Sequence, residues 1–234
     1  MSSDREREAE RVREVYARRA ERGLDARYDY WQPANLFIYQ ARERALLHLL
    51  HGVNMLPLTG RKVLDVGCGD GFVLREMTRY GANREDLTGV DLLPDRIARA
   101  RELMPGARIE AADAQALPFE DGQFDLVLAF TLLSTIKDQA VRERVVAEMR
   151  RVLRPNGLVI VYDFWTNPLN RSTRPLRRAS LEKLFPGAPV QFRNAGLAPP
   201  LVKALMSLPG GRFAANLVEV IPFLHTHYIA AVRP

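Results

Sequence analysis

Cysteine, lysine and long apolar runs are scarce in this sequence of 234 residues. The single cysteine, Cys68, excludes an internal disulfide and is typical of a reducing compartment. No run approaches the ~18 apolar residues of a membrane-spanning helix, and the charged N-terminus lacks the apolar segment of a signal peptide. We therefore expect a cytoplasmic protein without a transmembrane segment.

Lysine supplies only four of the 34 basic side chains, so arginine carries most of the positive charge behind the net value of +6. The arginines are interspersed with acidic residues, which argues against a basic module for nucleic acid or a membrane surface. We expect no nucleic-acid partner. An apolar content of 47% suffices for the core of one large domain with appendages.

The chain is organised around a glycine-rich turn. The apolar run Val63–Val66 reads as a buried strand, glycines follow at positions 67, 69 and 71, and a helical pattern begins at Phe72. Such a turn lets a ligand approach bare backbone beside a helix N-terminus. A dinucleotide fingerprint needs its third glycine at position 72, and the Gly-Lys-Ser/Thr of a phosphate loop is absent. Asp65 and Asp70 repel a pyrophosphate but suit a ligand bearing an ammonium or sulfonium group.

The stretch Val63–Gly71 resembles the first motif of the class I S-adenosylmethionine (SAM)-dependent methyltransferases of the small-molecule type. The segments Arg108–Ala114, Leu117–Phe130 and Val152–Leu158 resemble later motifs of that family, so the likeness covers residues 61–164. Strand–helix alternation by itself predicts a parallel sheet with helices on both faces. The resemblance implies an α/β fold with a doubly wound, seven-stranded, mostly parallel sheet whose last strand is antiparallel.

Periodicity predicts the individual elements and two parts of the chain. Residues 1–56 are expected to form an N-terminal helical lid, and residues 57–234 the SAM-binding domain. Helices are expected at 3–22, 35–51, 72–80, 95–104, 138–151, 180–186 and 200–208. Strands are expected at 63–66, 86–91, 108–114, 124–130, 158–162, 190–193 and 226–232. Ligands bind beyond the carboxyl ends of such parallel strands.

The cofactor site is expected at those ends. Asp91 follows the second strand, where a carboxylate accepts hydrogen bonds from ribose hydroxyls. By resemblance, Asp113 accepts from the adenine amino group and the next backbone N–H meets a ring nitrogen. The full set expected to bind SAM is Asp65, Gly67, Cys68, Gly69, Gly71, Asp91, Leu92, Asp113, Ala114, Phe130, Tyr16 and Arg19. In the lid, Tyr16, Arg19, Tyr28 and Trp31 either line SAM or the acceptor, or form a core between two helices.

Three groups are candidates on the acceptor side. Asp163 ends the fifth strand and either touches the acceptor or acts as a base, or else caps or fixes a loop. His225 and His227 share a face by alternation; one is a candidate base, and turn histidines are the alternative. No third ligand accompanies the two histidines, so no metal is expected. The arginines at 171–178 either grip an anionic acceptor or form a solvated loop.

The predicted function is methyl transfer from SAM to a small-molecule acceptor, at a hydroxyl oxygen of a sugar or secondary metabolite. N- or C-methylation and a non-catalytic SAM-binding regulatory protein are the alternatives. Phe72 at the fingerprint glycine and the missing Tyr-x-x-x-Lys pair disfavour an NAD oxidoreductase. DNA methylation is disfavoured because Ala129–Leu132 lacks an Asn/Asp-Pro-Pro-Tyr motif. The sequence leaves monomer and homodimer open.

Overall fold

The computed structural model describes residues 2–21, 29–167 and 172–234, and its strands form one seven-stranded sheet in the order β3-β2-β1-β4-β5-β7-β6. The first five strands are parallel, and β7 runs antiparallel to both β5 and β6. This confirms the predicted fold class. The strands are β1 (Val63–Val66), β2 (Leu87–Asp91), β3 (Arg108–Ala111), β4 (Phe124–Phe130), β5 (Leu153–Phe164), β6 (Val190–Asn194) and β7 (His227–Val232).

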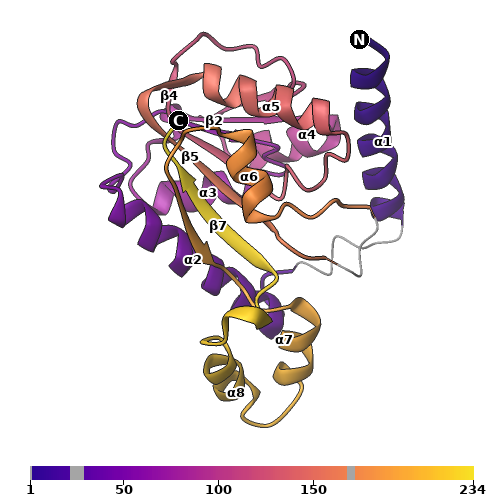
Figure 1. Ribbon diagram of the computed structural model, residues 1–234, viewed down its shortest axis with the longest axis vertical. Helices are drawn as coiled ribbons and strands as arrows, with labels where there is room; N and C mark the ends of the chain where they lie inside the picture. Colours follow the sequence, from indigo (N-terminus) through magenta and orange to yellow (C-terminus); the bar gives the residue numbers. More distant parts are fainter. Residues whose placement is uncertain (1, 22–28, 168–171) are drawn as a thin grey trace.

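Helices cover both faces of this sheet (Figure 1). They are α1 (Ser2–Glu21), α2 (Pro33–Gly52), α3 (Phe72–Arg79), α4 (Pro94–Leu103), α5 (Gln139–Arg151), α6 (Arg178–Leu184), α7 (Pro199–Met206) and α8 (Gly211–Val218). None of these described helices combines the length and apolarity needed to cross a bilayer.

Alternation along each strand divides the core into two clusters, one on each face. Val63 packs with α2, α3 and α4, whereas Leu64 and Val66 pack with α5 and α6. Every residue of β1 and β7 is buried, which explains why their sequences are apolar on both sides rather than alternating. The packing on both faces therefore holds the carboxyl ends of the parallel strands in fixed positions.

The second half of α2 belongs to the main core. Leu46, Leu49 and Leu50 are buried in the cluster that also holds β1 and α3. The N-terminal half packs elsewhere, with Phe37 against Val202 of α7. The predicted boundary at residue 56 thus falls after a helix that is packed on the sheet, and it stays a prediction.

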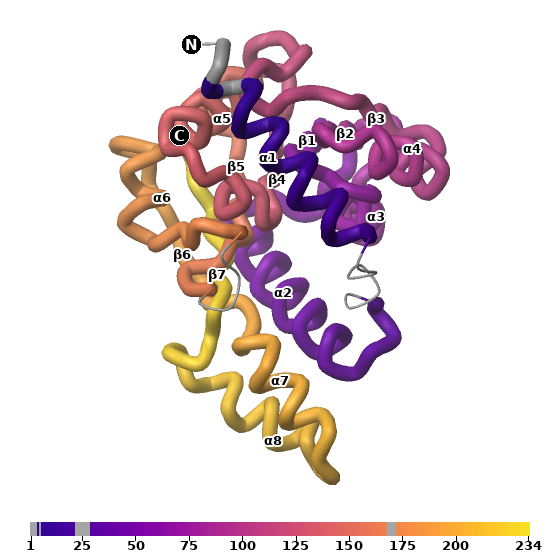
Figure 2. The backbone as a smooth tube through the Cα atoms, turned by 90° about the vertical axis from the view of Figure 1, so that its right-hand side faces the viewer, coloured from indigo at the N-terminus to yellow at the C-terminus, as the bar shows by residue number. Residues whose placement is uncertain are grey.

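Helices α7 and α8 form a hairpin inserted between β6 and β7, and both views show it projecting from the body (Figures 1 and 2). The sequence predicted α7 but not α8. Helix α8 begins after Gly210, whose φ is +71°, and a Cβ at Gly211 would lie 1.7 Å from the Leu205 carbonyl oxygen. The two glycines at its start and its length of eight residues hide this helix in the sequence.

Candidate functional site

The glycine turn is tied to the end of the neighbouring strand. The backbone N–H groups of Gly67 and Cys68 both donate to the Val90 carbonyl, at 2.8 and 2.9 Å. Gly67 has a φ of +77°, and a Cβ there would lie 3.0 Å from a Leu132 side-chain carbon. Glycine at this position therefore both permits the left-handed backbone and leaves room for the loop after β4.

Asp91 joins the turn to the loop after β2. One carboxylate oxygen accepts the Gly69 N–H at 2.9 Å and the other accepts the Leu93 N–H at 2.9 Å. Each oxygen of a carboxylate keeps a further lone pair for a second donor. The carboxylate is thus positioned by backbone on one side and available to a ligand on the other.

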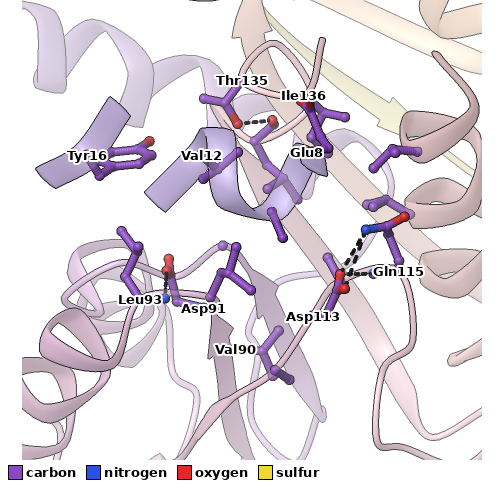
Figure 3. A pocket seen from close by; sticks show the side chains of 18 of the residues that line it. Glu8, Val12, Tyr16, Val90, Asp91, Leu93, Asp113, Gln115, Thr135 and Ile136 are labelled. Carbon is purple, nitrogen blue, oxygen red and sulfur yellow. Dashed lines mark hydrogen bonds between the residues drawn. The ribbon is translucent and has the colours of Figure 1, made fainter. Parts of the chain in front are cut away.

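A pocket lies between this edge of the sheet and α1, which crosses the strand ends in Figure 2. It is lined by side chains of α1 and by residues at or just after the carboxyl ends of β1, β2, β3 and β4. Figure 3 shows Val12 and Tyr16 of α1 on one side and Asp91 and Asp113 on the other. Of the residues predicted to bind SAM, the pocket is lined by Tyr16, Gly67, Asp91, Leu92, Asp113, Ala114 and Phe130.

Asp113 and Gln115 form the polar end of the pocket. Asp113 accepts the Gln115 backbone N–H at 2.9 Å, and the Gln115 side-chain oxygen accepts from Arg144 of α5 at 2.9 Å. Val90 and Ala112 line the space between them and Asp91. A carboxylate and backbone groups beside apolar walls suit a purine ring, which is flat and needs few polar partners at its edge.

Asp65 lies beneath the turn rather than in the pocket lining. Its side chain is 1% exposed, and neither oxygen has a hydrogen-bond partner among the described residues. Burial, with the negative charge of Asp91 adding to it, raises the pKa of Asp65 to about 8. Such an orphaned carboxyl group fits a cationic ligand above the turn, because a nearby positive charge restores its ionised form.

The other predicted turn residues have structural positions. Cys68 is buried in the core against Gly89, where a Cβ would lie 2.8 Å from its sulfur, and burial raises the pKa of the thiol. Gly71 caps α3 with a φ of +79°. A Cβ on Gly69 would lie 3.4 Å from Arg96. These residues shape the turn without lining the pocket.

Helix α1 is fastened over the pocket by charged contacts. Glu8 is buried and accepts the Lys137 backbone N–H at 2.7 Å, and Arg11 donates to Glu8 at 2.7 Å and to the Thr135 carbonyl. Further along α1, the Arg96 guanidinium lies 4.3 Å from the centre of the Tyr16 ring. The loop after β4 thus contacts the first half of α1, and Arg96 of α4 contacts the second half.

Arg19 and Trp31 do not line the pocket. Arg19 lies against the outer part of Tyr16, at 5.1 Å from its ring centre, and Trp31 is 77% exposed before α2. Tyr28 lies outside the described residues.

Aromatic rings continue from Phe130 away from the pocket. Phe130 and Tyr162 lie 5.5 Å apart, and the Tyr162 ring stacks on His227 at 5.1 Å with an interplanar angle of 3°. The Arg42 guanidinium lies within 5.8 Å of both the Phe130 and Tyr162 rings and donates to Glu76 at 2.6 Å. This ring row places His227 on the far side of Phe130 from the pocket.

The two histidines differ in their partners. His227 shares a hydrogen bond of 3.0 Å between its Nδ1 and the Thr226 hydroxyl, and burial followed by the charges of His225 and Arg42 lowers its pKa to about 3. His225 is buried, and neither ring nitrogen has a partner among the described residues. Burial also lowers the pKa of His225. Both rings are therefore uncharged at neutral pH.

Asp163 is fully buried and fixes the loop after β4. Its oxygens accept the Ser134 N–H at 2.9 Å and the Phe164 N–H at 2.8 Å. Burial raises its pKa to about 6. This geometry corresponds to the loop-fixing alternative, because both oxygens are engaged away from the pocket.

Two arginines of the 171–178 segment form hydrogen bonds within the protein, one to the loop after β4 and one to β6. Arg174 donates from its backbone to the Ser134 carbonyl at 2.8 Å and from its side chain to the Lys137 carbonyl at 3.1 Å. Arg178 donates to Asn194 at 2.7 Å. Arg171 lies outside the described residues. The arginines with described contacts thus act within the protein.

Sequence reasoning missed several lining residues, namely Glu8, Ala9, Val12, Leu93, Arg96, Gln115, Thr131, Leu132, Thr135 and Ile136. Gln115 lies two residues after Asp113, so its closeness to that motif could have indicated that it lines the pocket. Glu8 and Arg96 read as surface charges on amphipathic helices, and only the placement of α1 across the sheet brings them to the pocket.

Comparison with known proteins places this geometry in a family. Residues 64–161 match a methyltransferase domain model. A 2-methyl-6-phytyl-1,4-hydroquinone methyltransferase of Synechocystis sp. is 37% identical over 142 residues, which are 56% of this chain and 42% of that protein. A ubiquinone biosynthesis O-methyltransferase of Pseudomonas aeruginosa is 33% identical over 133 residues, 51% of this chain and 55% of that protein. The chain thus spans about half the length of these curated relatives.

The fold is shared with a SAM-dependent methyltransferase from Archaeoglobus fulgidus. The two align with a TM-score of 0.59 over 88% of this chain and 100% of the other, at 16% identity. The matched domain contains the glycine turn, Asp91, Asp113 and Phe130. Residues 64–161 thus form a methyltransferase domain related to those of these enzymes, on a fold that is shared with a SAM-dependent methyltransferase.

Proposed function

We propose that the protein transfers a methyl group from SAM to a hydroxyl oxygen of a small, ring-containing metabolite. The observation that carries this proposal is the pocket under α1, where Gly67, Asp91, Asp113 and Phe130 meet at the carboxyl ends of the strands. SAM supplies an activated methyl group on a sulfonium. The chain therefore needs to bind SAM, to orient the acceptor toward the methyl group and to exclude water.

In this proposal the chain's acids and lid hold the cofactor. Asp91 takes the ribose hydroxyls with its remaining lone pairs, and Asp113 takes the adenine amino group. Asp65 compensates the positive charge above the turn from its buried position. Helix α1 closes the pocket to water through Val12 and Tyr16.

The acceptor is proposed to lie along the ring row of Phe130, Tyr162 and His227. A row of stacked aromatic side chains favours a flat, apolar acceptor. Burial lowers the pKa of His227 to about 3, so the ring is too weak a base to take the hydroxyl proton, and we assign it to the wall of the acceptor site instead. Two relatives whose names refer to a hydroquinone and to ubiquinone biosynthesis support a phenolic ring as the acceptor class.

A panel experiment tests the proposal. The purified chain is incubated with SAM carrying a labelled methyl group and with hydroquinones, catechols, polyketide phenols and hydroxylated sugars. We expect labelled product with a phenolic acceptor, and mass spectrometry of the product distinguishes O-methylation from C- or N-methylation. SAM binding without transfer to any acceptor class would favour the SAM-binding regulatory protein instead.

A further inference from the structure

Large apolar side chains are exposed together in one small part of the protein. Eight such side chains are exposed among the described residues, and five of them lie between positions 208 and 223. They are 57–79% exposed, and we call them the hairpin patch: Leu208, Phe213, Leu217, Val220 and Phe223. Single exposed apolar residues are ordinary, but a cluster marks a surface that meets something apolar.

The patch includes the outer side of α8. Phe213 and Leu217 are four positions apart on α8, so both point to the same side, and Val220 is exposed in the turn that follows the helix. Ala215 on the other side of the helix is buried against Leu197 and Val202. Helix α8 therefore packs one apolar side on the protein and exposes Phe213 and Leu217 beside the polar Arg212 and Asn216.

Positive charge accompanies the patch. Lys203 and Arg212 are exposed, and neither side chain has an ionic partner among the described residues. The one acidic residue of positions 197–224 is Glu219, which is occupied by Arg44 at 2.7 and 2.9 Å. Apolar side chains flanked by unpaired cations match an anionic lipid surface, whose phosphates attract Lys and Arg while its acyl region receives Phe and Leu.

The position of the patch also favours a bilayer over a protein partner. The hairpin projects from the body in both views (Figures 1 and 2). Its outer end can therefore reach a bilayer before the rest of the protein does. It leaves and rejoins the fold at the bridge between Leu197 and His225, two residues before His227. A bilayer that binds the hairpin patch would thus lie near the proposed acceptor side.

We propose that the hairpin patch docks the protein on an anionic lipid bilayer, with Phe213, Leu217 and Phe223 entering the interface and Lys203 and Arg212 meeting lipid phosphates. Docking at this place would deliver an acceptor that is dissolved in the membrane, and in that respect it rests on the proposed function. The binding itself does not depend on turnover.

Vesicle flotation of the full-length chain tests the docking. Vesicles of phosphatidylcholine alone are compared with vesicles that also contain phosphatidylglycerol. We expect the wild-type chain to float with the anionic vesicles. Lys203→Glu with Arg212→Glu should weaken that binding by about tenfold or more, whereas the charge-matched control Lys62→Glu with Arg150→Glu, placed where the amino ends of the strands lie, should bind like wild type.

A second variant, Phe213→Ser with Leu217→Ser and Phe223→Ser, should lose binding to the anionic vesicles while its thermal unfolding and SAM titration stay at wild-type values. Wild-type protein that is folded but does not float would overturn the proposal, as would a serine variant that floats normally. A wild-type dimer that the serine variant converts to monomers, without vesicle binding, would instead assign the patch to a second copy of the chain. A failed methyl-transfer assay leaves the flotation result unaffected.

Discussion

A buried carboxyl group without a hydrogen-bond partner lowers the stability of a protein, and Asp65 is such a group. Its neighbours Asp91 and Glu76 raise its pKa further, and only Arg42 opposes them. A chain under selection for stability alone would place an apolar residue there. We interpret Asp65 as a site that trades folding free energy for attraction to the cationic part of SAM.

This trade predicts a pH dependence of stability. The pKa of Asp65 is raised to about 8 in the folded chain, whereas the unfolded chain releases this proton near the ordinary aspartate pKa of 3.8. The folded state then binds more protons, so the unfolding free energy falls as pH rises between those values. In Asp65→Asn we expect a flatter decline of the melting temperature across this range, and Asp95→Asn, an exposed acid on α4, should keep the wild-type slope. Equal slopes in all three proteins would contradict the burial argument.

A second residue-scale prediction concerns His227. Because its pKa is lowered to about 3, the ring is already neutral well below its usual range, and kcat/KM should show no acid limb near pH 6.5 from this group. Because a ring with so low a pKa cannot hold the hydroxyl proton, His227→Gln should raise the KM of the acceptor and leave kcat within about tenfold of the wild-type value. SAM affinity should remain at the wild-type value in a titration. A variant with an unchanged acceptor KM would remove His227 from the acceptor site.

Sequence alone could predict the acids of the cofactor edge, because Asp65, Asp91 and Asp113 each sit at or within a strand–turn motif. It could not predict that Asp91 is already bonded to Gly69 and Leu93, or that Asp163 is engaged by the loop after β4. Such contacts depend on how loops fold over strand ends. No local pattern encodes them.

Helix α1 is the element on which closure of the pocket depends. Its main attachments are Glu8 and Arg11 on the loop after β4, together with Tyr16 against Arg96. The sequence predicted a helix here, with solvated charges on its outer faces. The sequence showed neither which charges are buried nor the outward apolar face of α8, because both depend on tertiary packing rather than on periodicity.

Removing the Glu8 side chain should loosen the attachment of α1 over the pocket. In Glu8→Ala the Lys137 N–H and Arg11 lose their acceptor, a cost of about 1–3 kcal/mol for a buried group. We expect faster tryptic cleavage within α1 and SAM binding weakened by roughly five- to tenfold. Glu10→Ala, on the exposed side of the same helix, is the matched control. The same cleavage rate and affinity in both variants would exclude the Glu8 contact as the fastening.

At the scale of the whole molecule, the mostly parallel sheet and the glycine turn were predictable because strand–helix alternation and the motif agree. The hairpin between β6 and β7 was only partly predictable, since the family likeness ends near residue 164. In the proposed function, residues 64–161 hold the cofactor, and α2, β7, α7 and α8 surround the acceptor side.

The most direct test of the account is calorimetric titration of the purified chain with SAM, its demethylated product and NADH. We expect SAM and the demethylated product to bind in the micromolar range and NADH not to bind. Asp91→Asn should weaken SAM by about tenfold or more, as expected for a lost charged hydrogen-bond acceptor, and Asp95→Asn should not. A folded chain that binds NADH, or that binds SAM equally well with Asn at position 91, would contradict the assignment of the pocket under α1.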